Sequence, residues 1–158
     1  MPPRIALDTN VLAYAEGLDH APGDAAKGAL SLALLAEFRR TSLRPILATL
    51  ALAELHRLLI RVVRRSPVQA SLAVRSWQTA SETALVSAEG FDAALTLAAD
   101  HSLQMFDALI LSAAAEARCD LLVSEDLHEG FVWRGVTVTN PFGDHPDPRL
   151  KPFLSPAP

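Results

Sequence analysis

The chain has 158 residues, half of which are apolar, with a formal net charge of −4 and a single cysteine, Cys119. This length suits one compact domain with a single core and leaves little room for a second domain. The composition excludes an internal disulfide, a cysteine zinc site and a surface that attracts polyanions as a whole, so any contact with nucleic acid requires a local basic patch.

The N-terminal segment Met1-Pro2-Pro3-Arg4 lacks the apolar stretch of a signal peptide. No later segment approaches the roughly 20 uninterrupted apolar residues that a membrane span requires. The lone cysteine fits a reducing compartment. We therefore expect a cytoplasmic protein with no membrane partner.

The chain begins with an alternation of short strands and longer helices. Ile5–Leu7 is too short for a helix core and precedes polar residues that can cap one, so we expect a buried strand and then a helix from Val11. Apolar residues at helical spacing predict a helix over residues 25–40. The same reasoning predicts a strand over 44–48, helices over 49–65 and 68–79, a strand over 84–86 and a helix over 91–99.

The remainder continues this order and then changes composition. Ser102 is expected to cap a helix that runs to Ala117, and strands are expected over 120–124, 131–133 and 136–138. Strands separated by helices pair in parallel through right-handed crossovers. We therefore predict an α/β fold, a three-layer α/β/α sandwich with a mostly parallel sheet of four or five short strands.

A single domain is expected over residues 1–142. Six of the eleven prolines lie from Pro141 onward, which favours an extended or mobile Pro-rich C-terminal tail over residues 143–158. We therefore look for one site within the domain.

Four acidic residues are expected at one edge of the sheet. Asp8 follows the first strand and Asp126 lies two residues past Ser124, and ligands of open parallel sheets bind beyond the carboxyl ends of the strands. Glu54 and Asp107 interrupt apolar sequence near the starts of two helices, from which they can reach the same edge. Partly buried carboxylates are costly unless they are paired, and four that converge repel one another.

A divalent cation is the partner that the sequence favours for these carboxylates. Lys27 and Lys151 are the only lysines and neither follows a core strand, so we expect no ammonium partner. Oxygen ligands without sulfur, and without a histidine pair at ligand spacing, favour Mg²⁺ or Mn²⁺ over zinc. Such an ion activates water and holds phosphate oxygens during in-line displacement.

Four short motifs stand in a fixed order: Asp8-Thr9-Asn10, Glu54, Phe106-Asp107-Ala108-Leu109-Ile110 and Ser124-Glu125-Asp126. In this order they resemble the PIN-domain ribonucleases, and among these the VapC-type toxins of type II toxin–antitoxin systems, over residues 5–142. The resemblance implies a Mg²⁺- or Mn²⁺-dependent endoribonuclease that cleaves RNA. It also implies a homodimer and a cognate basic, VapB-like antitoxin whose tail occupies the cleft.

The resemblance assigns roles to particular residues. The catalytic acids would be Asp8, Glu54, Asp107 and Asp126. The metal ligands among them would be Asp8, Asp107 and Asp126. Asn10 and Ser124 would orient these ligands or a water, while Phe106 stands where the family commonly has tryptophan. Glu125 adds a carboxylate beside Asp126, and which of the two faces the metal stays open, with Asp126 favoured by its spacing from Ser124.

Each acid also has an ordinary structural interpretation. Asp8 can cap the helix from Val11, Asp107 can stabilise its helix macrodipole, and Asp126 with Glu125 can be plain loop acids.

On the helix predicted over 49–65, polar residues share one arc opposite the apolar stripe: Glu54, Arg57, Arg61, Arg64 and Arg65. The arginines Arg57, Arg61 and Arg64 are candidate RNA contacts, or they belong to a solvated face.

Two other functions compete with the nuclease. An acidic-site phosphohydrolase that forms an aspartyl phosphate needs a lysine at the site and a second aspartate where Asn10 stands. Neither requirement is met, because neither lysine follows a core strand and Asn10 is an amide. A non-catalytic PIN-like module that binds RNA or protein would be favoured by the loss of one acid. All four acids are present.

Overall fold

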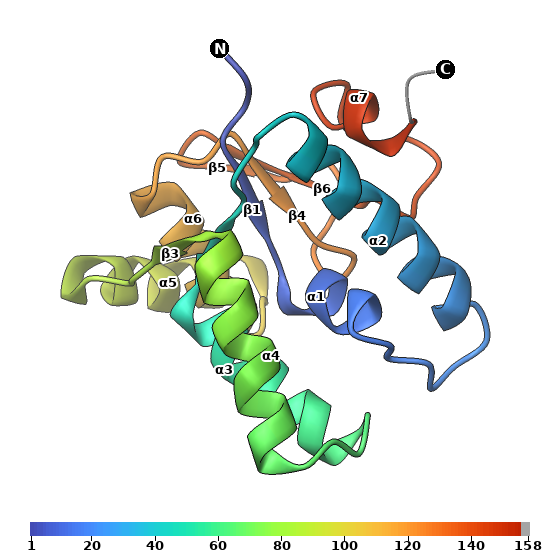
Figure 1. Cartoon of the computed structure of the whole chain (residues 1–158). Helices are drawn as coiled ribbons and strands as arrows, with labels where there is room; N and C mark the ends of the chain where they lie inside the picture. Colours follow the sequence, from blue (N-terminus) through green and yellow to red (C-terminus); the bar gives the residue numbers. More distant parts are fainter. Residues whose placement is uncertain (156–158) are drawn as a thin grey trace.

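The computed structural model describes residues 1–155, in which six short strands form one sheet in the order β3-β2-β1-β4-β6-β5 (Figure 1). Four neighbouring pairs, from β3 through to β6, are parallel, and β5 pairs with β6 in antiparallel fashion at the edge. The strands are β1 (Ile5–Leu7), β2 (Ile46–Ala48), β3 (Glu82–Ala84), β4 (Leu121–Val123), β5 (Val132–Trp133) and β6 (Val136–Thr139). The sheet therefore has six strands, where four or five were predicted.

Seven helices lie within the described residues: α1 (Thr9–Ala15), α2 (Asp24–Arg40), α3 (Thr49–Arg61), α4 (Pro67–Ala80), α5 (Ala88–His101), α6 (Met105–Glu116) and α7 (Lys151–Leu154). Helices α1 to α4 and α7 contribute to one hydrophobic cluster, while α5 and α6 contribute most of the helical side chains of the other. The predicted α/β fold with a mostly parallel central sheet is confirmed. No helix among residues 1–155 has the length and apolarity needed to cross a membrane.

The two hydrophobic clusters lie on opposite faces of the sheet. Ile5 and Leu7 of β1 enter the first cluster, and Ala6 between them enters the second. Because successive strand residues point to opposite faces, a strand covered on both sides must be apolar throughout. This burial holds β1 rigidly at the centre of the sheet. The residue that follows β1 therefore has a fixed position.

Helix α3 ends at Arg61, four residues before the predicted end. Arg64 takes a left-handed backbone with φ of 66°, and the backbone N–H of Arg65 donates to the carbonyl oxygen of Leu59 at 2.9 Å. The Arg65 side chain then turns inward to Glu16, 2.6 Å away. The chain needs these residues to reverse direction, because Ser66 before Pro67 must be extended to begin α4.

Ser102 does not cap the helix that follows it, contrary to the prediction. It has φ of 54° and its N–H donates to Ala98, so it ends α5. Gln104 occupies the N-cap position of α6, which begins at Met105, and makes no side-chain capping bond. The short connection leaves the first turn of α6 uncapped by a side chain.

The Pro-rich segment after residue 142 packs on the domain as far as the structure describes it. Leu150 is fully buried, and the ring of Phe153 lies edge-on to that of Phe38, with centroids 5.1 Å apart. The Asp147 N–H donates to the Thr139 hydroxyl at 2.8 Å. The expectation of an extended or mobile tail was therefore wrong for these residues. The high proline content favoured such a tail, but the burial of Leu150 and Phe153 stabilises a packed segment. Residues 156–158 of the predicted tail lie outside the described residues.

Candidate metal centre

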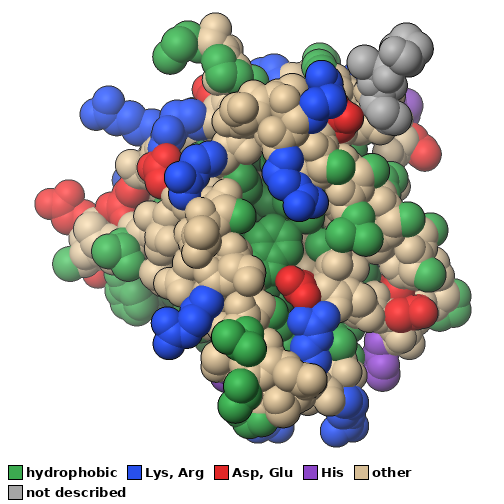
Figure 2. Space-filling model, viewed as in Figure 1, with side chains coloured by type: hydrophobic (Ala, Val, Ile, Leu, Met, Phe, Trp, Pro, Cys, Tyr) green, Lys and Arg blue, Asp and Glu red, His purple; other side chains and the backbone are tan. Residues whose placement is uncertain are grey.

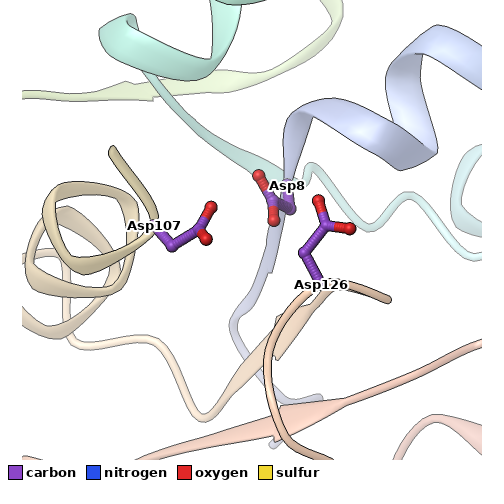
Figure 3. A group of neighbouring side chains, drawn as sticks. All are labelled: Asp8, Asp107 and Asp126. Carbon is purple, nitrogen blue, oxygen red and sulfur yellow. The ribbon is translucent and has the colours of Figure 1, made fainter. Parts of the chain in front are cut away.

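Three aspartates from separate parts of the chain converge beyond the carboxyl ends of the central strands (Figure 3). Asp8 lies between β1 and α1, Asp107 in the first turn of α6, and Asp126 in the loop after β4. One carboxylate oxygen of each lies within 4.8 Å of the others. We call this set the aspartate triad. In Figure 3 the three side chains point toward a common space.

Asp8 is buried, with 2% of its surface exposed, and each of its carboxylate oxygens accepts a hydrogen bond. Oδ1 accepts from the Thr9 N–H at 2.7 Å, which makes Asp8 the N-cap of α1, and Oδ2 accepts from the Ser124 hydroxyl at 2.7 Å. Burial raises the pKa of Asp8 to about 7, although these two hydrogen bonds oppose the shift. The capping role and a place in the triad therefore belong to the same residue.

Asp107 is partly buried, and the same cause acts on it. Desolvation, and then the charges of Asp126 and Glu54, raise the pKa of Asp107 to about 6. The triad is therefore a site where negative charge is costly as long as no cation is bound. Among residues 1–155, none of the salt bridges involves a member of the triad.

Asp126 is exposed but fixed by polar neighbours. Its Oδ2 accepts from Asn10 Nδ2 at 2.9 Å, and its backbone N–H donates to Ser124 Oγ at 3.1 Å. The Ser124 hydroxyl thus bridges Asp126 and Asp8, accepting from one and donating to the other. Asn10 Oδ1 is buried and has no hydrogen-bond partner within the described part of the chain.

Glu54 lies beside the triad, outside the group whose oxygens lie within 4.8 Å. Its Oε2 accepts from the Thr9 hydroxyl at 2.8 Å, and its Oε1 lies 4.0 Å from Nη2 of Arg57. With Asp107 and Asp126 it lines an open cleft of about 850 Å³. Sequence reasoning gave no role to Thr9, which links Asp8 to Glu54, although it stands inside the first motif.

Glu125 faces away from the triad toward α2. Its Oε2 lies 2.6 Å from Lys27 Nζ, and its Oε1 accepts from the Tyr14 hydroxyl. Burial and this bond raise the pKa of Tyr14 to about 12. The sequence did not predict the contact of Lys27, because Lys27 lies in the first turn of a helix about 100 residues before Glu125 and gave no signal of proximity. Lys27 and Tyr14 anchor the loop that carries Asp126.

The predicted row of arginines is only partly present. Arg57 lines the cleft and its side chain is 60% exposed. Arg61 ends α3, and Arg64 follows in the turn, so neither of them lines this cleft. Arg65 leaves the row altogether for its bond to Glu16. Arg57 is therefore the arginine of this group nearest to the triad.

A second hollow, of about 230 Å³, lies among α1, α2 and α4 and has a different character. Figure 2 shows apolar side chains on its floor, with Lys and Arg side chains around it. Trp77 lines it and donates from Nε1 to Glu16 at 2.7 Å. Because the triad lies elsewhere, the 850 Å³ cleft is the candidate site for chemistry.

The donor set of the triad fits a hard divalent cation. Its three carboxylates supply only oxygen, and no cysteine or histidine belongs to the group. Such ligands suit Mg²⁺ or Mn²⁺. A bound cation would also offset the cost of ionising Asp8 and Asp107, which their raised pKa values express.

An α/β sandwich with an acidic centre at the carboxyl edge of its parallel sheet defines the class of this protein, and a sequence comparison defines the family. The family model for the PIN domain matches residues 5–128. The chain therefore belongs to the PIN domain family, as its motifs indicated. No curated protein sequence matches it.

The solved structures with a similar fold include two from toxin–antitoxin systems. One is VapC20 from Mycobacterium tuberculosis, described as a toxin that cleaves the sarcin–ricin loop, with a TM-score of 0.59 and 17% sequence identity over 75% of this chain and 86% of that chain. The other is VapBC2 from Rickettsia felis bound to a DNA fragment from its promoter, with a TM-score of 0.58 and 18% identity over 86% of this chain and 97% of that chain. At these identities the likeness establishes the fold.

Proposed function

We propose that this protein is a Mg²⁺- or Mn²⁺-dependent endoribonuclease and the toxin component of a VapBC-type toxin–antitoxin system. The observation that carries the proposal is the convergence of Asp8, Asp107 and Asp126 in a PIN domain, beside a cleft that Asp107 and Asp126 line. The similarity to the toxin VapC20 supports the choice of RNA as substrate.

In this proposal the triad holds the ion, and the neighbouring side chains hold the triad. Thr9 and Ser124 fix both oxygens of Asp8, and Asn10 fixes one oxygen of Asp126. The bound ion supplies Lewis-acid charge that activates water and offsets the charge of the phosphate. Pre-organised ligands of this kind avoid the cost of reorganisation during the reaction.

Glu54 is the fourth catalytic acid of the proposal. Its carboxylate accepts from the Thr9 hydroxyl and lines the same cleft as Asp107, and in this role it would orient water there or accept its proton. Arg57 would contact an RNA phosphate at the cleft, and Arg61 and Arg64 would contact phosphates farther along the strand. These contacts would supply locally the positive charge that the whole chain lacks.

The partner of the proposal is a basic antitoxin. A peptide that inserts an arginine or lysine among the aspartates would neutralise the same charge as the metal, and so would inhibit the enzyme. The VapBC2 neighbour supports such a pair. A homodimer and a cytoplasmic location complete the proposal. Native mass spectrometry of the protein purified from its own cells tests the partner, since the absence of any small basic protein would contradict it.

The direct test is cleavage of RNA by the purified chain with Mg²⁺ or Mn²⁺. Asp8→Asn and Asp107→Asn are expected to abolish cleavage while the fold remains intact by circular dichroism. Asp92→Asn is the matched control, because Asp92 is exposed on α5 and outside the triad. Undiminished cleavage by both triad variants would reveal a contaminating nuclease and refute the proposal.

The competing functions give different results in the same preparation. A non-catalytic module would bind RNA without cleaving it at any metal concentration. An acidic-site phosphohydrolase would hydrolyse p-nitrophenyl phosphate, a phosphomonoester, and leave RNA intact.

A further inference from the structure

Phe106 is an exposed aromatic side chain on the wall of the catalytic cleft. It has 57% of its surface exposed, more than any of the other five phenylalanines. It makes no aromatic pair within residues 1–155, whereas Phe38, Phe131, Phe142 and Phe153 all do. Exposing an aromatic ring forgoes the free energy that its burial would provide. Core packing therefore does not explain Phe106.

Phe106 also has a definite relation to the triad. It directly precedes Asp107, so their Cα atoms are about 3.8 Å apart. Successive helix residues point in different directions, and here Asp107 turns to the triad while Phe106 lies on the cleft wall. A ligand that reaches the triad therefore passes beside the ring.

The rest of the cleft favours a nucleotide as the group that meets this ring. Arg57 on α3 lines the cleft with Phe106, and its side chain is mostly exposed. The start of α6, where Gln104 makes no side-chain cap, adds backbone N–H groups with partial positive charge. An aromatic face, a guanidinium and a cation-binding triad match the base and the phosphates of a single strand.

We propose that Phe106 is a stacking platform for one base of single-stranded RNA, next to the phosphate held at the aspartate triad. This inference rests on the proposed nuclease function and adds to it a base-binding subsite. Stacking uses the π-face that every base has, so the subsite tolerates any base. It requires an unpaired base, since a base inside a duplex is already stacked.

The test uses single-stranded RNA decamers with 2-aminopurine at each position in turn, whose fluorescence falls when the base stacks. Binding is measured with Ca²⁺ in place of Mg²⁺, and a gel verifies that the RNA stays intact. One position is expected to be quenched by the wild-type protein. Phe106→Ala is expected to remove this quenching and weaken binding about 10- to 100-fold. An abasic nucleotide at the same position should weaken wild-type binding equally and leave binding by the alanine variant unchanged.

Matched variants separate stacking from other roles of the ring. Phe106→Trp should bind RNA close to wild type, while Phe106→Leu, which keeps apolar area without a π-face, should resemble alanine. Phe91→Ala is the control, because Phe91 is an exposed phenylalanine on α5 that does not line the cleft. Calorimetry should give every Phe106 variant the Mn²⁺ affinity of the wild type.

Several results would overturn the inference. If Phe106→Ala or Phe106→Leu bound RNA as tightly as the wild type does, no base would stack on the ring. The exposed Phe106 ring would then be assigned to an apolar contact with a protein. A parallel loss of Mn²⁺ affinity would assign Phe106 to the structure of α6. A wild-type protein that binds Mn²⁺ but neither binds nor cleaves RNA would refute the nuclease function itself, and the subsite with it.

Discussion

Replacement of Asp8 by asparagine should stabilise the metal-free protein at alkaline pH. The pKa of Asp8 rises from 3.8 to about 7 in the folded protein because its carboxyl is buried. Since the folded state holds the proton more tightly than the unfolded chain, this contribution to stability is complete below about pH 4 and is lost as the pH rises through 7. The asparagine of the variant carries no charge at any pH and can still cap α1.

The size of the effect follows from the shift. Each pKa unit corresponds to about 1.4 kcal/mol. When the pH is lowered from 7 to 5, protonation of Asp8 should therefore raise the free energy of unfolding of the wild type by about 2–3 kcal/mol. For a chain of this size that equals a change in Tm of about 5–10 °C. Asp107, with a pKa of about 6, acts in the same direction.

Thermal unfolding in EDTA from pH 5 to pH 8 measures this effect. The difference in Tm between the wild type and Asp8→Asn isolates the contribution of Asp8, because all other groups titrate in both proteins. This difference should favour the variant increasingly as the pH rises. A difference that is independent of pH, or that favours the wild type at pH 8, would refute the account of a costly buried charge.

Three further predictions use the same protein. Saturating Mn²⁺ at pH 8 should raise the Tm of the wild type but not of Asp107→Asn, because a ligand stabilises only the state that binds it; equal shifts would place the ion elsewhere. Lys27→Met should lower the free energy of unfolding in urea by about 1–3 kcal/mol by leaving Glu125 without its cation, and Lys151→Met should not; equal effects would deny the ion pair a role. Phe153→Ala should cost about 3 kcal/mol if the C-terminal helix packs on α2, and a neutral result would exclude that packing.

The sequence predicted the acidic edge because short apolar strands allow few arrangements. Ile5–Leu7 and Leu121–Val123 are apolar throughout, so both had to be buried strands, and the residues after them had to meet at the carboxyl edge. Asp107 was expected at this edge because it lies near the start of a helix and because the order of the motifs resembles that of the PIN-domain ribonucleases. Sequence spacing alone does not bring α6 to that edge.

The details that escaped prediction depend on long-range packing or on single backbone angles. Lys27 meets Glu125 only because α2 crosses the loop after β4. Ser102 ends a helix through a left-handed φ that serine adopts rarely, so its residue type favoured a cap at the start of a helix. Phe153 and Leu150 stand among prolines, and their burial depends on long-range packing in the cluster that includes Phe38 of α2.

The central claim is that the three aspartates form one cation site, and anomalous diffraction from crystals soaked in Mn²⁺ tests it most directly. We expect a single strong peak bounded by the carboxylate oxygens of Asp8, Asp107 and Asp126. Absence of density there at saturating Mn²⁺, with a peak beside other acids, would contradict the account.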